Sequence, residues 1–191
     1  MDALPSPGRR PMWPWIVVAL AATLGPLIIK LEGRPWWCKC GEPRLWISQS
    51  SGPHTSQHFL DPYAATHIEH GLLFFLVLIL LRVRKPSIRW SLAVVAEALW
   101  EIAENARFIV ERYRQAAAPD YFGDSVANSF GDILACIAGY ALAEKLGGRR
   151  ALIALVVLEL LMLAWIRDSL LLNIVMLLFP LDAIRAWQTA A

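Results

Sequence analysis

The sequence predicts an all-α integral membrane protein, a bundle of about six transmembrane helices that forms one domain over residues 1–191. Three observations predict this class. Apolar residues make up 57% of the chain and charged residues 18%, against about 45–50% and about 25% in soluble domains. The apolar residues lie in long runs, and the mean hydropathy is +0.47. The net charge of +2 is too small for a phosphate-binding surface, which excludes a nucleic-acid partner.

The apolar runs give the expected helices in order. A spanning helix needs about 20 residues, with a range of about 17–25, and the first four runs meet this length while the last two are shorter. No small-x-small cleavage site follows the first run, so we expect it to remain as a helix rather than to be removed as a signal peptide. The expected helices cover residues 13–29, 66–83, 88–110, 125–143, 151–166 and 170–184.

The basic residues predict how these helices cross the membrane. The short links 82–89 and 145–150 carry four and three Lys or Arg residues. Because basic residues are enriched in cytoplasmic loops, both links are expected inside, together with Arg9 and Arg10. With six spans, both termini then lie inside (N-in, C-in), and the Pro- and Trp-containing loop 32–65 between the first two helices lies outside, on the membrane surface.

Polar residues interrupt the apolar runs at helical spacing, which places them in stripes. The stripes consist of His67 and His70 in the second helix, Glu97, Glu101, Glu104 and Asn105 in the third, and Asp124, Asn128 and Asp132 in the fourth. Because the third and fourth helices run in opposite directions, their stripes match in depth near the outer surface. Ionisable residues inside a membrane are costly, so we expect one shared polar site that opens outward.

Carboxylates in a low-dielectric interior cannot all stay charged and unpaired. Three solutions are open: protonation, pairing with nearby arginines, or neutralisation by a divalent metal. Histidine with carboxylate is a ligand set for zinc, manganese or iron, although the spacing matches no diagnostic motif. The candidate metal ligands are His58, His67, His70, Glu101, Asp124 and Asp132.

Most of these candidate metal ligands could instead act as general acids or bases in catalysis. Asn105 and Asn128 would orient a reacting group, and Arg107 and Arg112, at head-group level, would hold a phosphate. Two alternatives remain: a buried hydrogen-bonded network that fixes helix packing, and an ion or proton path. The candidate catalytic residues are His67, His70, Glu101, Asn105, Asp124, Asn128 and Asp132.

Two cysteines stand in the outer loop as C-x-C. A disulfide across one intervening residue is geometrically unfavourable, so Cys38 and Cys40 are expected to be free thiols or part of a turn. Half of a metal site is the alternative, but no second pair of ligands is apparent in the sequence. His54 is expected to be a surface residue of the loop.

Residues 61–142 resemble the VanZ-like family of bacterial membrane proteins. The resemblance rests on HGLLFFLVLILL beginning at His70, WEIAENARFIVER at 100–112 and DSVANSFG at 124–131. Two positions depart from the family pattern: Thr66 stands where the family has Asp, and Glu104 where it often has Gln. The resemblance implies a role in the cell envelope, with antibiotic tolerance as one form of it.

Nearly the whole chain resembles a bacterial inner-membrane family of unknown function. That resemblance rests on SQHFLDPY at 56–63, HIEHG at 67–71, ERYR at 111–114, YFGDSVANSFGD at 121–132 and IRDSLLLN at 166–173. It implies a multi-pass protein of the bacterial inner (plasma) membrane with membrane lipids as partners. It names no activity and no protein partner.

Together these observations predict a membrane-embedded enzyme or binding protein with an outward-facing pocket of His, Glu and Asp. Its substrate would be an envelope lipid or glycolipid, and a divalent metal is the one cofactor that the pocket suggests. The alternative is a non-catalytic membrane scaffold or a small transporter with a hydrogen-bonded polar core.

Overall fold

The computed structural model describes residues 12–116 and 118–189, which leaves Arg9 and Arg10 outside the described part. Within this part the regular structure is helical, apart from one isolated bridge between Trp46 and Leu60. The prediction of an all-α fold is confirmed. The helices are α1 (Trp13–Leu31), α2 (Ala64–Leu80), α3 (Pro86–Asn105), α4 (Arg107–Ala116), α5 (Val126–Leu146), α6 (Gly148–Ile166), α7 (Leu170–Leu178) and α8 (Asp182–Thr189).

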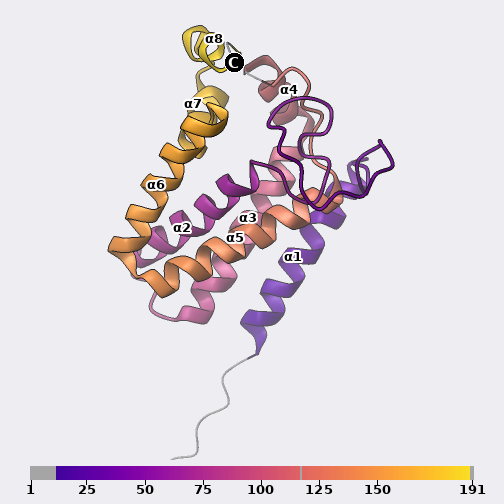
Figure 1. Cartoon of the computed structure of the whole chain (residues 1–191). Coiled ribbons are helices and arrows are strands. Elements are labelled where there is room, and N and C mark those ends of the chain that lie inside the picture. Colours follow the sequence, from indigo (N-terminus) through magenta and orange to yellow (C-terminus); the bar gives the residue numbers. More distant parts are fainter. Residues whose placement is uncertain (1–11, 117, 190–191) are drawn as a thin grey trace, which may run out of the picture.

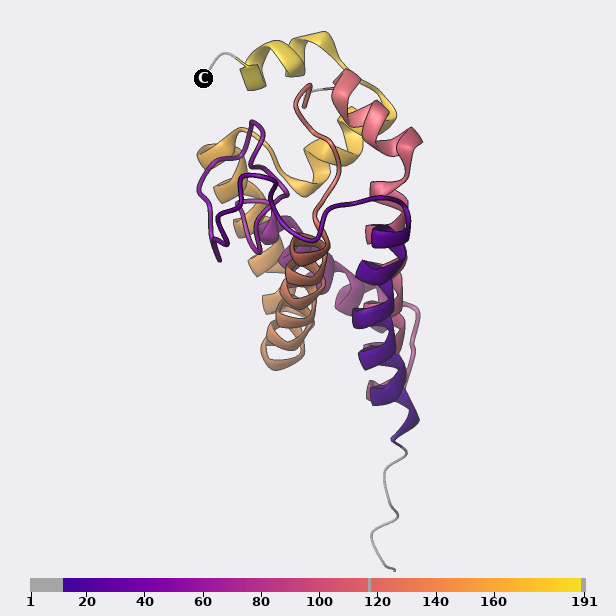
Figure 2. The same cartoon turned by 90° about the vertical axis from the view of Figure 1, so that its right-hand side faces the viewer.

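The longer helices form a bundle in which α2 packs along α5, α1 packs on α3, and α6 lies beside α2 (Figure 1). The segment 32–63, α4, α7 and α8 gather at one end of this bundle, and α1 begins at the opposite end (Figures 1 and 2). We call the former the loop end. One apolar cluster packs Leu72 and Phe75 against Tyr140, and another packs Val94 and Ile133 against α1.

Two glycines allow α2 and α5 to approach at backbone distance. A Cβ atom at Gly71 would lie 2.2 Å from the carbonyl oxygen of Cys136, and one at Gly139 would lie 2.2 Å from that of Ile68. Small residues at such crossings let helix backbones pack closely, which is common in membrane proteins. The contact holds the histidine-bearing start of α2 in a defined position on α5.

The third expected helix, 88–110, is divided into two. α3 ends at Asn105, Ala106 adopts an extended conformation (φ −63°, ψ 138°), and α4 begins at Arg107. The carbonyl oxygen of Asn105 accepts a hydrogen bond from the guanidinium of Arg34, and its side chain bonds to Asp124. These bonds replace helical ones at the end of α3, so the prediction of one continuous helix to residue 110 is wrong.

The prediction of one continuous last helix over residues 170–184 is also wrong. α7 ends at Leu178, and Phe179 is extended because it precedes Pro180, which disfavours the helical conformation of the residue before it. The nine residues of α7 span about 14 Å, less than half of a hydrocarbon core of about 30 Å. The prediction of six spans is therefore not confirmed.

The C-terminal helix α8 lies at the loop end. Arg185 Nε donates to the carbonyl oxygen of Ala116 at the end of α4, 2.6 Å away, and an Arg167 guanidinium nitrogen donates to the Trp187 carbonyl oxygen at 3.0 Å. The beginning of α1 lies at the other end of the molecule (Figure 1). The turn at Pro180 thus folds α8 over the loop end, opposite the beginning of α1, and the predicted N-in, C-in topology is not confirmed.

Two of the described helices, α1 and α5, are long and apolar enough to cross a membrane. α2 is a further apolar helix of 17 residues. These helices suggest that the protein associates with a membrane.

Candidate functional site

Polar side chains of α2, α3 and α5 meet in the interior near the loop end. His67 and His70 point from successive turns of α2 toward Glu97 of α3. Glu97 and Glu101 have exposed fractions of 0%, and Asp132 on α5 of 4%. The sequence placed these residues in stripes of matching depth, and the structure brings these stripes together around His67.

His67 is the centre of this cluster. Its Nδ1 atom lies 2.6 Å from Glu97 Oε1 and 3.4 Å from Glu101 Oε1, and its Nε2 atom lies 3.8 Å from Asp132 Oδ2. The contact with Glu97 is a hydrogen bond, whereas both carboxylate oxygens of Glu101 are buried without a hydrogen-bond partner. Buried polar atoms are normally paired, so the cluster has hydrogen-bonding capacity left for a proton, a ligand or an ion.

A second group of bonds joins α3 to the segment before α5. Asn105 Nδ2 donates to Asp124 Oδ2 (2.6 Å), and the Asp124 backbone N–H donates to Asn105 Oδ1 (2.7 Å). The Tyr121 hydroxyl donates to Asp124 Oδ1 at 3.0 Å. Burial raises the pKa of Asp124, although the hydrogen bonds from Asn105 and Tyr121 act in the opposite direction. Asn105 therefore positions Asp124 rather than a free reacting group.

Asn128 lies one turn into α5. Its side chain is buried, and neither amide atom has a hydrogen-bond partner. Its backbone N–H bonds to the Ser125 hydroxyl, which caps the start of α5. Asn128 is therefore buried inside the protein, and its side chain has no hydrogen-bond partner among the described residues.

A cavity of about 1100 Å³ lies over this cluster at the loop end. His67, His70 and Asp132 of the buried cluster line it, and we call these three residues its floor; Glu104 and Asp124 line it as well. Much of its remaining wall is apolar. The apolar wall consists of Leu73 and Phe74 of α2, Leu99 and Trp100 of α3, and Leu170, Ile174, Met176 and Leu177 of α7.

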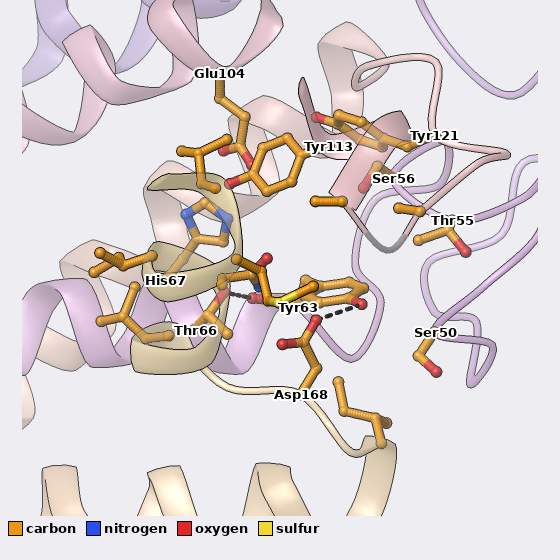
Figure 3. Close-up of a pocket in the computed structure, with 18 of the residues that line it drawn as sticks. Ser50, Thr55, Ser56, Tyr63, Thr66, His67, Glu104, Tyr113, Tyr121 and Asp168 are labelled. Atoms are coloured by element: carbon orange, nitrogen blue, oxygen red, sulfur yellow. Dashed lines mark hydrogen bonds between the residues drawn. The ribbon is translucent and has the colours of Figure 1, made fainter. Parts of the chain in front are cut away.

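Tyrosines and a further carboxylate also line the cavity (Figure 3). Tyr63 donates to Asp168 Oδ2 at 3.2 Å and so connects the start of α2 with the loop between α6 and α7. Burial raises the pKa of Asp168 to about 6, against hydrogen bonds from Ser169 and Tyr63 that lower it. Tyr113 and Tyr121 also line the cavity. The candidate residues chosen from the sequence omitted all of these, although Tyr121 and Asp168 fall in the motifs YFGD and IRDS.

Three candidates from the sequence lie away from the polar side chains of α2, α3 and α5. Arg107 is exposed and pairs with Glu111 at 3.1 Å. Arg112 donates to the carbonyl oxygens of Leu177 and Leu178, so it caps the end of α7. The structure brings neither arginine to the polar cluster, because the break after Asn105 turns α4 away from the line of α3.

The third is His58, which lies in the 32–63 segment and not beside His67. Its Nε2 atom is 3.9 Å from Cys40 Sγ and 3.4 Å from His54 Nδ1. Asp61 stands between this segment and α2 and accepts hydrogen bonds from the backbone N–H groups of Ser56 and Tyr63, at 2.6 and 2.8 Å. Burial raises the pKa of Asp61 to about 6, despite these two bonds.

Among the residues that the structure describes, two groups of ligand atoms in the core could hold a metal ion. The first is His67, His70 and Glu97, and the second is His67, Glu101 and Glu104; within each group the ligand atoms lie within 4.8 Å of one another. Both groups include Glu residues that the predicted metal set lacked, Glu97 and Glu104. Helical periodicity placed these two residues on the correct face, but the contacts that select them depend on the packing of α2 on α3.

Fold and site together define a helical protein with a histidine–carboxylate cluster buried beneath a partly apolar cavity. The chain belongs to the family described as "Protein of unknown function (DUF2585)", which matches residues 29–190. This confirms the predicted resemblance to a family of unknown function.

The relatives are bacterial proteins named UPF0314. One from Sinorhizobium fredii is 43% identical, covering 94% of this chain and 93% of the relative. Others come from Rhizobium meliloti (42%, covering 91% and 90%) and Paracoccus denitrificans (42%, covering 94% and 93%). No solved structure matches the chain.

Proposed function

We propose that this protein is an integral protein of the bacterial inner membrane that binds the polar head of an amphiphile, a membrane lipid or glycolipid, in the cavity at the loop end. The observation that carries the proposal is the composition of that cavity. It combines a floor of His67, His70 and Asp132 with an apolar wall from α2, α3 and α7. Such a cavity suits a molecule with one polar and one apolar end.

The distribution of side chains supports a membrane environment. Glu97 and Glu101 are completely buried, whereas Leu160 and Leu161 on the outer face of α6 are 61% and 58% exposed. A water-soluble protein rarely leaves such a contiguous apolar surface uncovered. Five of the described helices, α1, α2, α3, α5 and α6, have 17–21 residues, which is within the range for crossing a membrane. In a membrane, lipid acyl chains would cover this apolar exterior.

The size and position of the cavity support an amphiphilic ligand. Ligand sites commonly have volumes of about 300–1000 Å³, and the cavity, at about 1100 Å³, is slightly larger than this range. Leu99 lines the cavity and is 61% exposed, so the cavity reaches the outer face of α3. An acyl chain could lie along this face while the head group contacts the polar floor.

The charges around the cavity favour a head group that donates hydrogen bonds. The acidic lining residues outnumber the single arginine of the lining, Arg167. Hydroxyl and amine groups donate to carboxylate and imidazole acceptors, whereas a bare phosphate would be repelled by the acids. A sugar or amine-bearing head therefore fits better than the phosphate role first assigned to Arg107 and Arg112. The acidic lining residues are Glu104, Asp120, Asp124, Asp132 and Asp168.

A metal-dependent enzyme is the second candidate, and the unpaired carboxylate of Glu101 favours it. A divalent cation held by His67, Glu101 and Glu104 would neutralise excess acid and pair that carboxylate. A cation bound there would activate water or polarise a bond of the head group. The VanZ-like resemblance and a cell-envelope role remain predictions of the sequence that agree with either candidate.

Metal analysis and lipid mass spectrometry on one sample, purified in mild detergent, test the proposal. Ala103 lines the cavity, so Ala103→Phe should displace the bound amphiphile, whereas Leu92→Phe, on the exposed face of the same helix, should not. The proposal requires a co-purified species that is enriched over bulk lipid in wild type and lost in Ala103→Phe only. Equal lipid content in all three proteins would contradict it and leave the hydrogen-bonded scaffold.

A further inference from the structure

The segment 32–63 has an unusual construction for its length. Its two halves pair through a short contact between residues 44–47 and 59–60: Ile47 N–H donates to the Leu60 carbonyl oxygen and Leu60 N–H to that of Leu45, both at 3.1 Å. This contact closes a loop and brings its two halves together. The segment is also bonded to the start of α5, where the N–H groups of residues 125–127 donate to its carbonyl oxygens. Small regions with little apolar core usually need a covalent or metal crosslink to hold one conformation.

Four side chains that can ligate metal meet where the loop closes. Cys38 Sγ lies 3.4 Å from His54 Nδ1, Cys40 Sγ lies 3.9 Å from His58 Nε2, and the two imidazole nitrogens are 3.4 Å apart. All four ligand atoms lie within 4.8 Å of one another. The cysteines are free thiols in the structure, which agrees with the unfavourable geometry of a disulfide across one residue.

These separations are those of a tetrahedral zinc site. Zinc–sulfur bonds of about 2.3 Å and zinc–nitrogen bonds of about 2.0–2.1 Å place sulfur and nitrogen about 3.6 Å apart and two nitrogens about 3.3 Å apart. The observed values of 3.4, 3.9 and 3.4 Å lie close to them. The spacing His54-x₃-His58 is typical of such sites, while Cys38-x-Cys40 is one residue shorter than the usual cysteine pair.

The surroundings also favour a bound cation. His58 has an exposed fraction of 1%, and its Nε2 atom is directed at a thiol and an imidazole rather than at an acidic partner. The backbone N–H of Cys40 points at Cys38 Sγ from 3.4 Å, a contact that stabilises a thiolate. Cys40 is exposed, which leaves a path for the metal to enter.

We infer that the loop binds one structural zinc ion through four side chains: Cys38, Cys40, His54 and His58. Two thiolates and two imidazoles are a soft, four-coordinate set that selects zinc over magnesium or calcium and leaves no position for substrate. The ion would join the two halves of a loop whose residues Ser50, Thr55 and Ser56 line the cavity. It therefore fixes one wall of the cavity, and this inference does not depend on what the cavity binds.

Metal content and cobalt substitution of the full-length protein test this site. We expect about one zinc ion per chain, and replacement by Co²⁺ should give the visible bands of tetrahedral cobalt together with a thiolate-to-metal charge-transfer band. The core groups around His67 contain no sulfur, so they cannot produce that band. Cys38→Ser and His54→Gln should lose the ion, whereas His70→Gln in the core and Cys136→Ala in α5 should keep it.

A second measurement uses the wild-type protein, so that the inference is tested even where a variant fails to fold. Titration of the zinc-loaded protein with a mercurial thiol reagent should release one equivalent of zinc as Cys38 and Cys40 react. Absence of bound metal, a cobalt spectrum without the charge-transfer band, or a band that persists in Cys38→Ser would each overturn the assignment. Release of the metal by reaction of the thiols would support it.

Discussion

Glu97 lies between His67 and His70 and offers one carboxylate oxygen to each ring: Oε1 is 2.6 Å from Nδ1 of His67, and Oε2 is 2.9 Å from Nδ1 of His70. The carboxylate thus sets the orientation of both rings at the cavity floor. Each imidazole donates its Nδ1 proton to Glu97 when neutral, which leaves its Nε2 atom as the acceptor or ligand atom. The Nε2 atom of each ring is therefore the one available to accept a proton or to bind a ligand.

Removing this carboxylate should destabilise the protein. Glu97→Ala leaves two buried imidazoles without their acceptor, at a cost of about 1–3 kcal/mol for each orphaned group. Glu111→Ala removes an exposed partner of Arg107 and should cost about 0–1 kcal/mol. Thermal unfolding in detergent compares the two. Equal midpoints for both variants would mean that Glu97 does not hold the histidines.

The contact between α2 and α5 gives a second prediction. In Gly139→Ala the new methyl group meets the Ile68 carbonyl oxygen at 2.2 Å, so the helices must separate, at a cost of about 1–3 kcal/mol or more. Gly148→Ala is the matched control, because a Cβ atom there meets nothing within 4 Å. Unfolding midpoints should fall for Gly139→Ala alone. A drop of the same size in the control would point to the loss of glycine itself as the cause.

The Tyr63–Asp168 pair predicts a dependence of stability on pH. The pKa of Asp168 is raised to about 6 in the folded protein from an ordinary value of 3.8, so the folded state binds this proton more tightly than the unfolded chain does. Its contribution to stability is complete below pH 3.8 and is lost as the pH rises to about 6. Asp61 acts in the same direction, since its pKa is also raised to about 6.

Asp168→Asn should therefore flatten the fall in unfolding midpoint between about pH 4 and about pH 6. The substitution removes the titrating group and keeps an oxygen that can accept from Tyr63. Asp182→Asn, which removes an exposed carboxyl of α8, is the control and should follow the wild-type curve. Parallel curves for wild type and Asp168→Asn would show that folding does not raise the pKa of Asp168.

The placement of α8 predicts the orientation of the chain. A click-reactive residue at Ser51 should be labelled from outside the cell, and one at Ser87 only after permeabilisation, because the basic composition of the link 82–89 predicts that it lies inside. A C-terminal alkaline phosphatase fusion should be active, because α8 lies at the same end as Ser51. An inactive phosphatase with correctly labelled Ser51 would require α7 and α8 to rearrange into a span.

The sequence was sufficient for the helices whose limits depend on apolar periodicity. The expected helices 13–29 and 125–143 begin within one residue of the observed starts of α1 and α5. It was not sufficient where a side chain or proline ends a helix inside an apolar run, as at Asn105 and Pro180. Apolar composition does not reveal such a break, because apolar residues resume after it, at 108–110 after Asn105 and at Leu181 after Pro180.

The same distinction applies to the site. Spacing alone put His67 with His70 and aligned Glu97 with Glu101, since these relations lie within one helix. Which carboxylate meets which histidine depends on the close packing of α2, α3 and α5. His58 was assigned to the core although the path of the loop carries it to the cysteines, a path set by the bridge between Trp46 and Leu60.

Site-specific photocrosslinking to lipid tests the central claim most directly. A photoreactive residue replaces Trp100 at the cavity wall or Leu160 on the outer face of α6, and the attached molecules are identified by mass spectrometry. A binding cavity predicts that the residue at position 100 captures one class of amphiphile with a hydroxyl- or amine-rich head, reduced by Asp132→Asn, while position 160 captures bulk lipid. The same bulk composition at both positions, unchanged by Asp132→Asn, would contradict the account.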